Sequence, residues 1–124
     1  MKRKTRRFLL ATSIFLIASV VILLLINHYV MPRIRETALK EDLHSMRKQI
    51  DQYAADKPQL PGSLDDLVKA GYLSEIPMDA ISRKREWKIE IGQAIIARTQ
   101  AEGVIDVHSQ APGKGSDGIP FTEY

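Results

Sequence analysis

The amino-acid sequence predicts an α+β fold: a long N-terminal helix, transmembrane in its first half, packs in its second half on a small antiparallel sheet. Three observations support this prediction. Residues 8–26 form an uncharged run of nineteen residues directly after a cluster of cations. Residues 33–55 repeat apolar side chains at helical spacing, and residues 87–107 contain the alternation of apolar and polar residues that is typical of half-buried strands.

The N-terminal apolar run has the length and the flanking charge of a membrane anchor. As a helix, it would extend about 29 Å at about 1.5 Å per residue, which matches the hydrocarbon thickness of a bilayer. Five of the first seven residues are Lys or Arg, and such clusters stay in the cytoplasm. We therefore expect a cytoplasmic basic segment over residues 1–7, a transmembrane helix over residues 8–30 and a domain beyond the membrane over residues 31–124. The anchoring side chains include Phe8, Leu16, Val20 and Leu24.

A cleaved secretory signal peptide is the alternative interpretation of this N-terminus. The basic start fits, but the apolar cores of signal peptides span about 7–15 residues, fewer than are present here. A small-x-small cleavage site should follow the core, and residues 25–32 contain none. The sequence therefore favours an uncleaved anchor.

The composition after the anchor indicates one small domain that acts through neither nucleic-acid binding nor catalysis. From Arg33 onward there are 13 basic and 15 acidic residues, a net charge of −2, so the overall charge of +3 comes from the N-terminal cations. A nucleic-acid-binding domain needs a basic face, which this balance does not indicate. The chain has no cysteine, which excludes disulfides and thiol catalysis. It also lacks a nucleophile–base pattern and a phosphate loop, so we expect neither an enzyme nor a small-molecule substrate.

The pattern of residues 33–55 predicts an amphipathic helix. Its apolar residues lie mostly three to five positions apart and form one stripe, while charged residues occupy the other face. Pro32 allows a helix that starts there or one that continues from the membrane with a bend, and we favour a nearly continuous helix of about 45 residues. Together with the membrane helix, this stripe is expected to provide the association surfaces of the protein. The stripe residues assigned to association are Ile34, Leu43, Met46 and Ile50.

A loop, a short helix and a sheet are expected to follow. Ser63, with Asp66 three residues later, approximates a capping box and opens a helix that Gly71 ends. Three strands are expected at residues 87–91, 94–99 and 104–107, with a tight turn at Gly92-Gln93. The glycine- and proline-rich stretch 109–124 is a loop that is ordered only if other residues pin it.

Several segments, taken in order, carry a family resemblance. They are Val30-Met31-Pro32, residues 50–57, Leu60-Pro61, residues 63–68, Gly71-Tyr72-Leu73, residues 76–79, residues 103–109 and Asp117-Gly118. Their order and spacing resemble the type IV pilin-like proteins, and in particular the major pseudopilin of type II secretion systems. The resemblance implies a single-pass protein of the cell inner membrane with a periplasmic domain. It also implies that its partners are other pseudopilin or secretion-apparatus subunits.

Three positions depart from that family. With Pro32 aligned, the glycine of the prepilin peptidase site should fall at Leu10, and the acidic residue near the mature N-terminus at Phe15. In the family this glutamate pairs with the freed amine of a neighbouring subunit inside the apolar filament core, where an unpaired charge is costly. With Phe15 the pairing is lost, so we expect a protein that keeps its anchor and does not polymerise in the usual way. Asp79-Ala80 also stands where the family usually has Asp-Pro.

The resemblance also implies a calcium ion in the C-terminal loop, with Asp117 at the family's Asp-Gly position. Calcium takes about six to eight oxygen ligands, and the loop offers few carboxylates. The alternative is that Asp117-Gly118 is a turn dipeptide. His44 and His108 have no second metal ligand at a diagnostic spacing, so surface or packing roles are expected for both.

The leading functional hypothesis is a membrane-anchored, pseudopilin-like component of a type II secretion or related pilus apparatus that acts by protein–protein association. The alternative is a stand-alone membrane-anchored binding or sensory domain on a pilin scaffold, because a fold does not determine a function.

Overall fold

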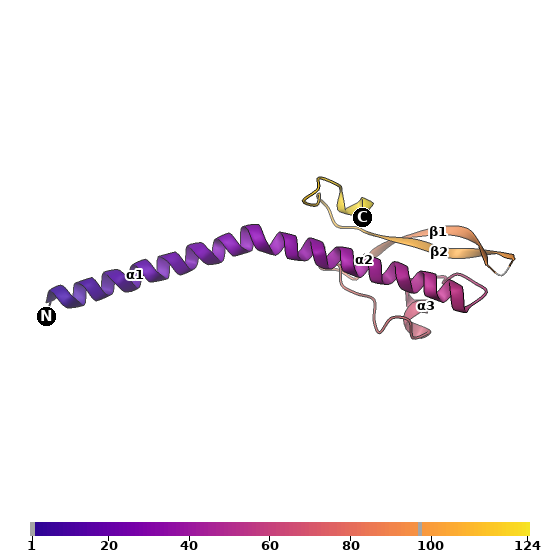
Figure 1. Ribbon diagram of the computed structural model, residues 1–124, viewed down its shortest axis with the longest axis horizontal. Coiled ribbons are helices and arrows are strands. Elements are labelled where there is room, and N and C mark those ends of the chain that lie inside the picture. Colours follow the sequence, from indigo (N-terminus) through magenta and orange to yellow (C-terminus); the bar gives the residue numbers. More distant parts are fainter. Residues whose placement is uncertain (1, 97) are drawn as a thin grey trace. The chain divides into compact units, whose positions relative to one another are not determined.

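The structure, a computed structural model, describes residues 2–96 and 98–124. It comprises two compact units, Met1–Ile34 and Arg35–Tyr124. One long helical stretch and a small two-stranded antiparallel sheet confirm the predicted α+β class (Figure 1). The elements are α1 (Lys2–Leu25), a π-helical turn (Ile26–Val30), α2 (Met31–Asp56), α3 (Leu64–Lys69), β1 (Trp87–Ile96), β2 (Thr99–Ser109) and a 3₁₀ turn (Phe121–Glu123).

The N-terminal helix has one segment that is long and apolar enough to cross a membrane. Its large apolar side chains are exposed on all sides, with about half to three quarters of the surface of Phe8, Leu16, Val20 and Leu24 accessible. A helix that is apolar around its whole circumference is typical of burial in lipid or protein. Helical conformation continues from Arg3 to Asp56, which confirms the expected near-continuous helix. Pro32 has no N–H to donate within the helix, and the π-helical turn lies directly before this region.

α2 directs its apolar stripe into the core of the second unit. Leu43, Met46 and Ile50 are at most 2% exposed and belong to one cluster with side chains from α3, β2 and the C-terminal residues. The stripe is therefore already packed within its own chain. The association role expected for these three residues is wrong, because a partner cannot reach them. Ile34 differs, since 53% of its surface is exposed.

α3 begins and ends at the residues that the sequence indicates. The Oδ2 atom of Asp66 accepts hydrogen bonds from the backbone N–H groups of Gly62 (2.9 Å) and Ser63 (3.1 Å). These bonds fix the start of α3, because they give a hydrogen-bond acceptor to the backbone N–H groups that come directly before the helix. Gly71 adopts a φ of +83°, the left-handed conformation that ends helices. The short helix is thereby held with Leu64 and Leu67 in the core.

The sheet is a two-stranded hairpin, so the expected three-stranded meander is wrong. β1 and β2 pair in antiparallel register from Trp87–Ser109 to Ile96–Thr99. The predicted turn at Gly92-Gln93 does not exist, because Gly92 lies in the middle of β1 and pairs with Gly103. The chain instead reverses between Ile96 and Thr99.

The two paired glycines serve close packing and not a turn. A Cβ atom on Gly103 would lie 2.6 Å from the Leu60 Cβ and 2.7 Å from the Pro61 carbonyl oxygen, and one on Gly92 would clash with Ile105. The Val104 N–H also donates to the Pro61 carbonyl at 2.8 Å. The loop after α2 therefore lies directly against β2, at a position where only glycine fits.

Candidate functional site

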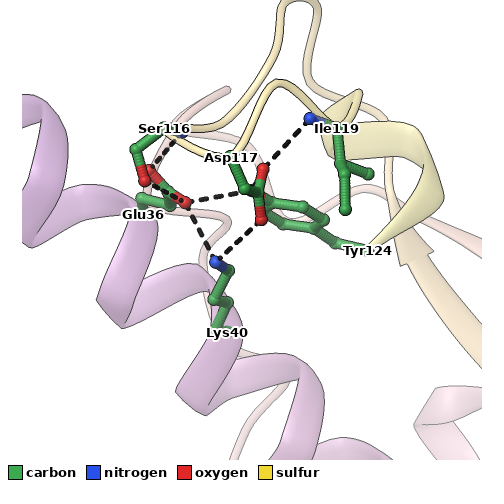
Figure 2. Close-up of polar contacts among 6 residues, drawn as sticks. All are labelled: Glu36, Lys40, Ser116, Asp117, Ile119 and Tyr124. Carbon is green, nitrogen blue, oxygen red and sulfur yellow. Dashed lines mark hydrogen bonds and ion pairs between the residues drawn. The ribbon is translucent and has the colours of Figure 1, made fainter.

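A polar cluster joins α2 to the C-terminal segment, residues 110–124 (Figure 2). We call it the Glu36 cluster; it consists of Glu36, Lys40, Ser116, Asp117 and Tyr124. Oε1 of Glu36 accepts hydrogen bonds from the Lys40 ammonium (3.0 Å), the Tyr124 hydroxyl (2.9 Å) and the Ser116 hydroxyl (3.1 Å). Oε2 accepts the backbone N–H of Ser116 at 2.9 Å. These bonds hold in place the C-terminal loop, which the sequence predicted to be ordered only if other residues pin it.

The charges of the Glu36 cluster stabilise one another. Glu36 is 7% exposed, yet its pKa is lowered to about 2, chiefly by the hydrogen bond from Lys40 and then by the Ser116 N–H, against the opposing effect of burial. The same contact raises the pKa of Lys40 above its ordinary value. Both groups are therefore charged over the neutral range, and the buried carboxylate has a full set of donors.

Tyr124 bridges the two carboxylates of the cluster. Its hydroxyl lies 2.9 Å from Glu36 Oε1 and 2.7 Å from Asp117 Oδ1, and its single proton is donated to one of them at a time. Burial, followed by these two hydrogen bonds, raises the pKa of Tyr124 to about 12. The Lys40 ammonium lies 4.6 Å from the centre of the Tyr124 ring, a cation–π contact that adds to the attachment.

The surroundings of Asp117 do not fit a calcium ion. Oδ1 accepts hydrogen bonds from the Tyr124 hydroxyl and from the Ile119 N–H (3.0 Å), while Oδ2 lies 3.4 Å from the Lys40 ammonium. Calcium needs about six to eight oxygen ligands, and here both oxygens of the carboxylate already accept hydrogen bonds from the chain itself. The bond to Ile119 and the φ of +81° at Gly118 are those of a turn. The geometry therefore matches the turn alternative.

Arg47 makes a second attachment between α2 and the rest of the second unit. The sequence pattern had placed Arg47 on the charged face of the helix, opposite the apolar stripe. Its Nε donates to Asp106 Oδ1 at 2.6 Å, and its Nη2 donates to the carbonyl oxygens of Val107 (2.9 Å) and Tyr124 (3.0 Å). A single side chain of α2 thus holds both β2 and the C-terminal segment. The local signal was its spacing, four residues after Leu43 and three before Ile50, which places Arg47 at the edge of the apolar stripe.

Asp79 is a fully buried carboxylate that fixes the loop before β1. Oδ1 accepts the backbone N–H groups of Ile81 (2.7 Å) and Ser82 (3.1 Å), and Oδ2 accepts the hydroxyl of Ser109. Ser109 in turn accepts the Ala111 N–H at 2.9 Å. Both oxygens of this buried carboxylate are thus hydrogen-bonded, which is the pattern of a structural group.

No protein-family model, curated protein or solved structure matches this chain. The functional assignment therefore depends on the residues and contacts described above.

The lowered pKa of Glu36 predicts an acid limit for the attachment of the C-terminal segment. The carboxyl has an ordinary pKa of 4.5 and a folded-state pKa of about 2, so its contribution to stability is complete above about pH 4.5 and is lost as the pH falls toward 2. We expect the chemical shift of the Glu36 carboxyl carbon to titrate with a midpoint near pH 2. Lys40→Met removes the largest cause and should raise that midpoint. A midpoint near 4.5 in the unaltered protein would contradict this assignment.

Proposed function

We propose that this protein is a membrane-anchored, pseudopilin-like component of a type II secretion or related pilus apparatus. In this proposal the N-terminus lies in the cytoplasm, the helix crosses the inner membrane once, and the second unit lies in the periplasm. The protein acts by binding other pseudopilin or secretion-apparatus subunits and catalyses no reaction. The observation that carries the proposal is the exposed apolar surface of α1, because Leu43, Met46 and Ile50 of the second unit are already buried in that unit's core.

The burial of Leu43, Met46 and Ile50 supports an association surface on α1. Leu43, Met46 and Ile50 are taken up by the core, whereas the anchor residues are exposed around the whole helix. In lipid, helices associate through close packing of such apolar faces. Phe15 supplies no charge for the filament-type pairing of the family, so we propose that the protein remains beside a filament and not within one.

Membrane insertion is tested by placing two charges on one face of the anchor. In Leu16→Asp/Val20→Asp, each aspartate near the middle of the span costs about 2.5–3.5 kcal/mol of insertion free energy, a combined cost of about 6 kcal/mol. We expect this variant to leave the membrane fraction and to be extracted by alkaline carbonate. The matched control, Leu16→Ala/Val20→Ala, should remain in the membrane. Retention of the aspartate variant would disprove the anchor.

The partner class is tested by cross-linking within the membrane of the native host. A photoreactive side chain at Ile17 should capture pseudopilin or secretion-apparatus subunits, which mass spectrometry identifies. The same group at Ile105, an exposed residue of β2, is the control for contacts of the periplasmic domain. Capture of lipid alone at Ile17, with no subunit at either position, would disprove the secretion assignment and favour the stand-alone binding domain.

A further inference from the structure

The hairpin brings Glu90 of β1 beside Asp106 and His108 of β2. Asp106 and His108 lie two residues apart on β2 and therefore on the same face, and Glu90 of β1 is the register partner of Asp106. Their ligand atoms all lie within 4.8 Å of one another. A β-bulge next to this pair, where Ile91 is paired with Val104, leaves Ile105 as the extra residue. Only the folded register reveals this group.

The spacing of these atoms matches metal ligands better than hydrogen-bonded pairs. His108 Nε2 lies 3.5 Å from Glu90 Oε2 and 3.6 Å from Asp106 Oδ2. An N–H···O hydrogen bond spans about 2.7–3.2 Å, which is shorter than either distance. Two ligands bound at about 2.1 Å in a tetrahedral site lie about 3.4 Å apart. The observed distances therefore leave room for an ion between the three groups.

Contacts with residues outside the group orient His108 and Asp106, so that a ligand atom of each faces the other members of the group. His108 Nδ1 lies 2.8 Å from the main-chain oxygen of Tyr124, which can only accept, so Nδ1 is the donor in this bond and Nε2 is the ring nitrogen that faces the carboxylates. Oδ1 of Asp106 is held by Arg47 at 2.6 Å and by the Val107 N–H at 2.7 Å, which leaves Oδ2 free for an ion. A backbone carbonyl on the far nitrogen of a histidine is the usual support of a metal ligand.

The Asp106 carboxylate is held on one side by donors of its own chain, the Arg47 guanidinium and the Val107 N–H. Arg47 neutralises one side of this carboxylate, and Lys88 is the register partner of His108. Since Arg47 bonds only Oδ1, the oxygen that faces His108 still carries a free lone pair.

We propose that Glu90 Oε2, Asp106 Oδ2 and His108 Nε2 form a binding site for a divalent transition metal of the zinc class, with solvent or a partner's side chain as the fourth ligand. One imidazole with two carboxylates suits Zn²⁺, whereas Ca²⁺ and Mg²⁺ take oxygen ligands. The bound ion would join β1 to β2 and, through His108, to the C-terminal segment. This site is distinct from Asp117, where the family resemblance implied calcium.

The test is a calorimetric titration of the full-length protein in detergent, without a polyhistidine tag, using ZnCl₂ as the probe. We expect one Zn²⁺ per chain, and Co²⁺ should give the visible absorption of a tetrahedral site. Loss of a supporting second-sphere group commonly weakens metal binding about 10–100-fold, so His108→Gln, which removes a ligand itself, should weaken it at least about 100-fold. Glu90→Gln should weaken it at least about 10-fold.

Matched substitutions separate this site from non-specific binding. His44 is exposed on α2 and Glu102 is exposed on β2, so His44→Gln and Glu102→Gln should leave Zn²⁺ affinity unchanged. Glu90→Gln also guards against a folding defect, because Glu90 is exposed and its metal-free thermal midpoint should equal that of the unaltered protein. Equal affinity in His108→Gln and His44→Gln, or a stoichiometry that does not saturate, would mean adventitious surface binding only and would overturn the proposal.

Discussion

Replacing Met46 with alanine is expected to lower the free energy of unfolding of the second unit by about 2–5 kcal/mol. Met46 is fully buried among the core side chains of α3, β2 and the C-terminal residues, so its truncation removes apolar contacts and leaves a cavity. Trp87 is the single tryptophan of the chain and is itself part of this core. Urea denaturation followed by Trp87 fluorescence therefore measures the effect directly.

The matched control is another apolar residue of the same helix that is exposed. Ile34→Ala should change the unfolding free energy by less than about 0.5 kcal/mol, because 53% of the Ile34 surface is exposed. Comparing Met46→Ala with Ile34→Ala distinguishes a role of the apolar stripe in core packing from a role in association with other subunits. If Met46→Ala weakened cross-linking to partner subunits and left unfolding unchanged, the core assignment of Met46 would be wrong.

Glu36→Ala is expected to destabilise the second unit by about 2–4 kcal/mol and to release the C-terminal segment. The carboxylate accepts four hydrogen bonds from three residues, and its loss leaves the Lys40 ammonium and the Ser116 N–H without this acceptor. A charge-assisted hydrogen bond contributes about 1.5–3 kcal/mol, and unsatisfied donors add a further cost. Denaturation gives the free energy, and the rate of carboxypeptidase digestion measures the release of the segment.

Two further variants separate the charge of Glu36 from general effects of substitution. Glu36→Gln keeps the shape and one carbonyl acceptor but loses the charge, so it should show an intermediate destabilisation. Glu41→Ala removes an exposed carboxylate from the same helix and should leave both readouts nearly unchanged. Equal digestion rates in Glu36→Ala and Glu41→Ala would show that the cluster does not hold the segment.

Local patterns predicted the elements whose causes are local. The three-residue spacing of Ser63 and Asp66 placed the start of α3, and Gly71 placed its end, because caps depend on neighbours in sequence. The helical period of α2 correctly placed Leu43, Met46 and Ile50 on the buried face, but it also placed Ile34 there, and 53% of the Ile34 surface is exposed. The period could not identify what covers the buried face, because it indicates that one face of the helix is buried and not which residues bury it. The stripe was therefore assigned to other subunits when the chain's own sheet covers it.

The local sequence pattern could not resolve the roles of Gly92, Glu36 and His108. Gly92 within an alternating strand is consistent with a turn or with a close approach, and only its partner Gly103 and the side chain of Ile105 decide between them. Lys40 lies four residues after Glu36, a spacing that indicates a helical ion pair, but Ser116 and Tyr124 lie 80 and 88 residues further along the chain, so no spacing indicates the rest of the cluster. Likewise, His108 has no ligand-type spacing until the strand register places Glu90 beside it.

The long separation between Glu36 and Tyr124 has a consequence for the order of folding. Loop-closure entropy grows with the length of the enclosed chain, and non-local contacts slow folding. The hairpin and α3 close short loops and can form early, whereas the Glu36–Tyr124 bond encloses 88 residues. During synthesis α2 emerges well before its polar partners Ser116 and Tyr124. Docking of the C-terminal segment onto the Glu36 carboxylate is therefore a late step in the folding of the second unit.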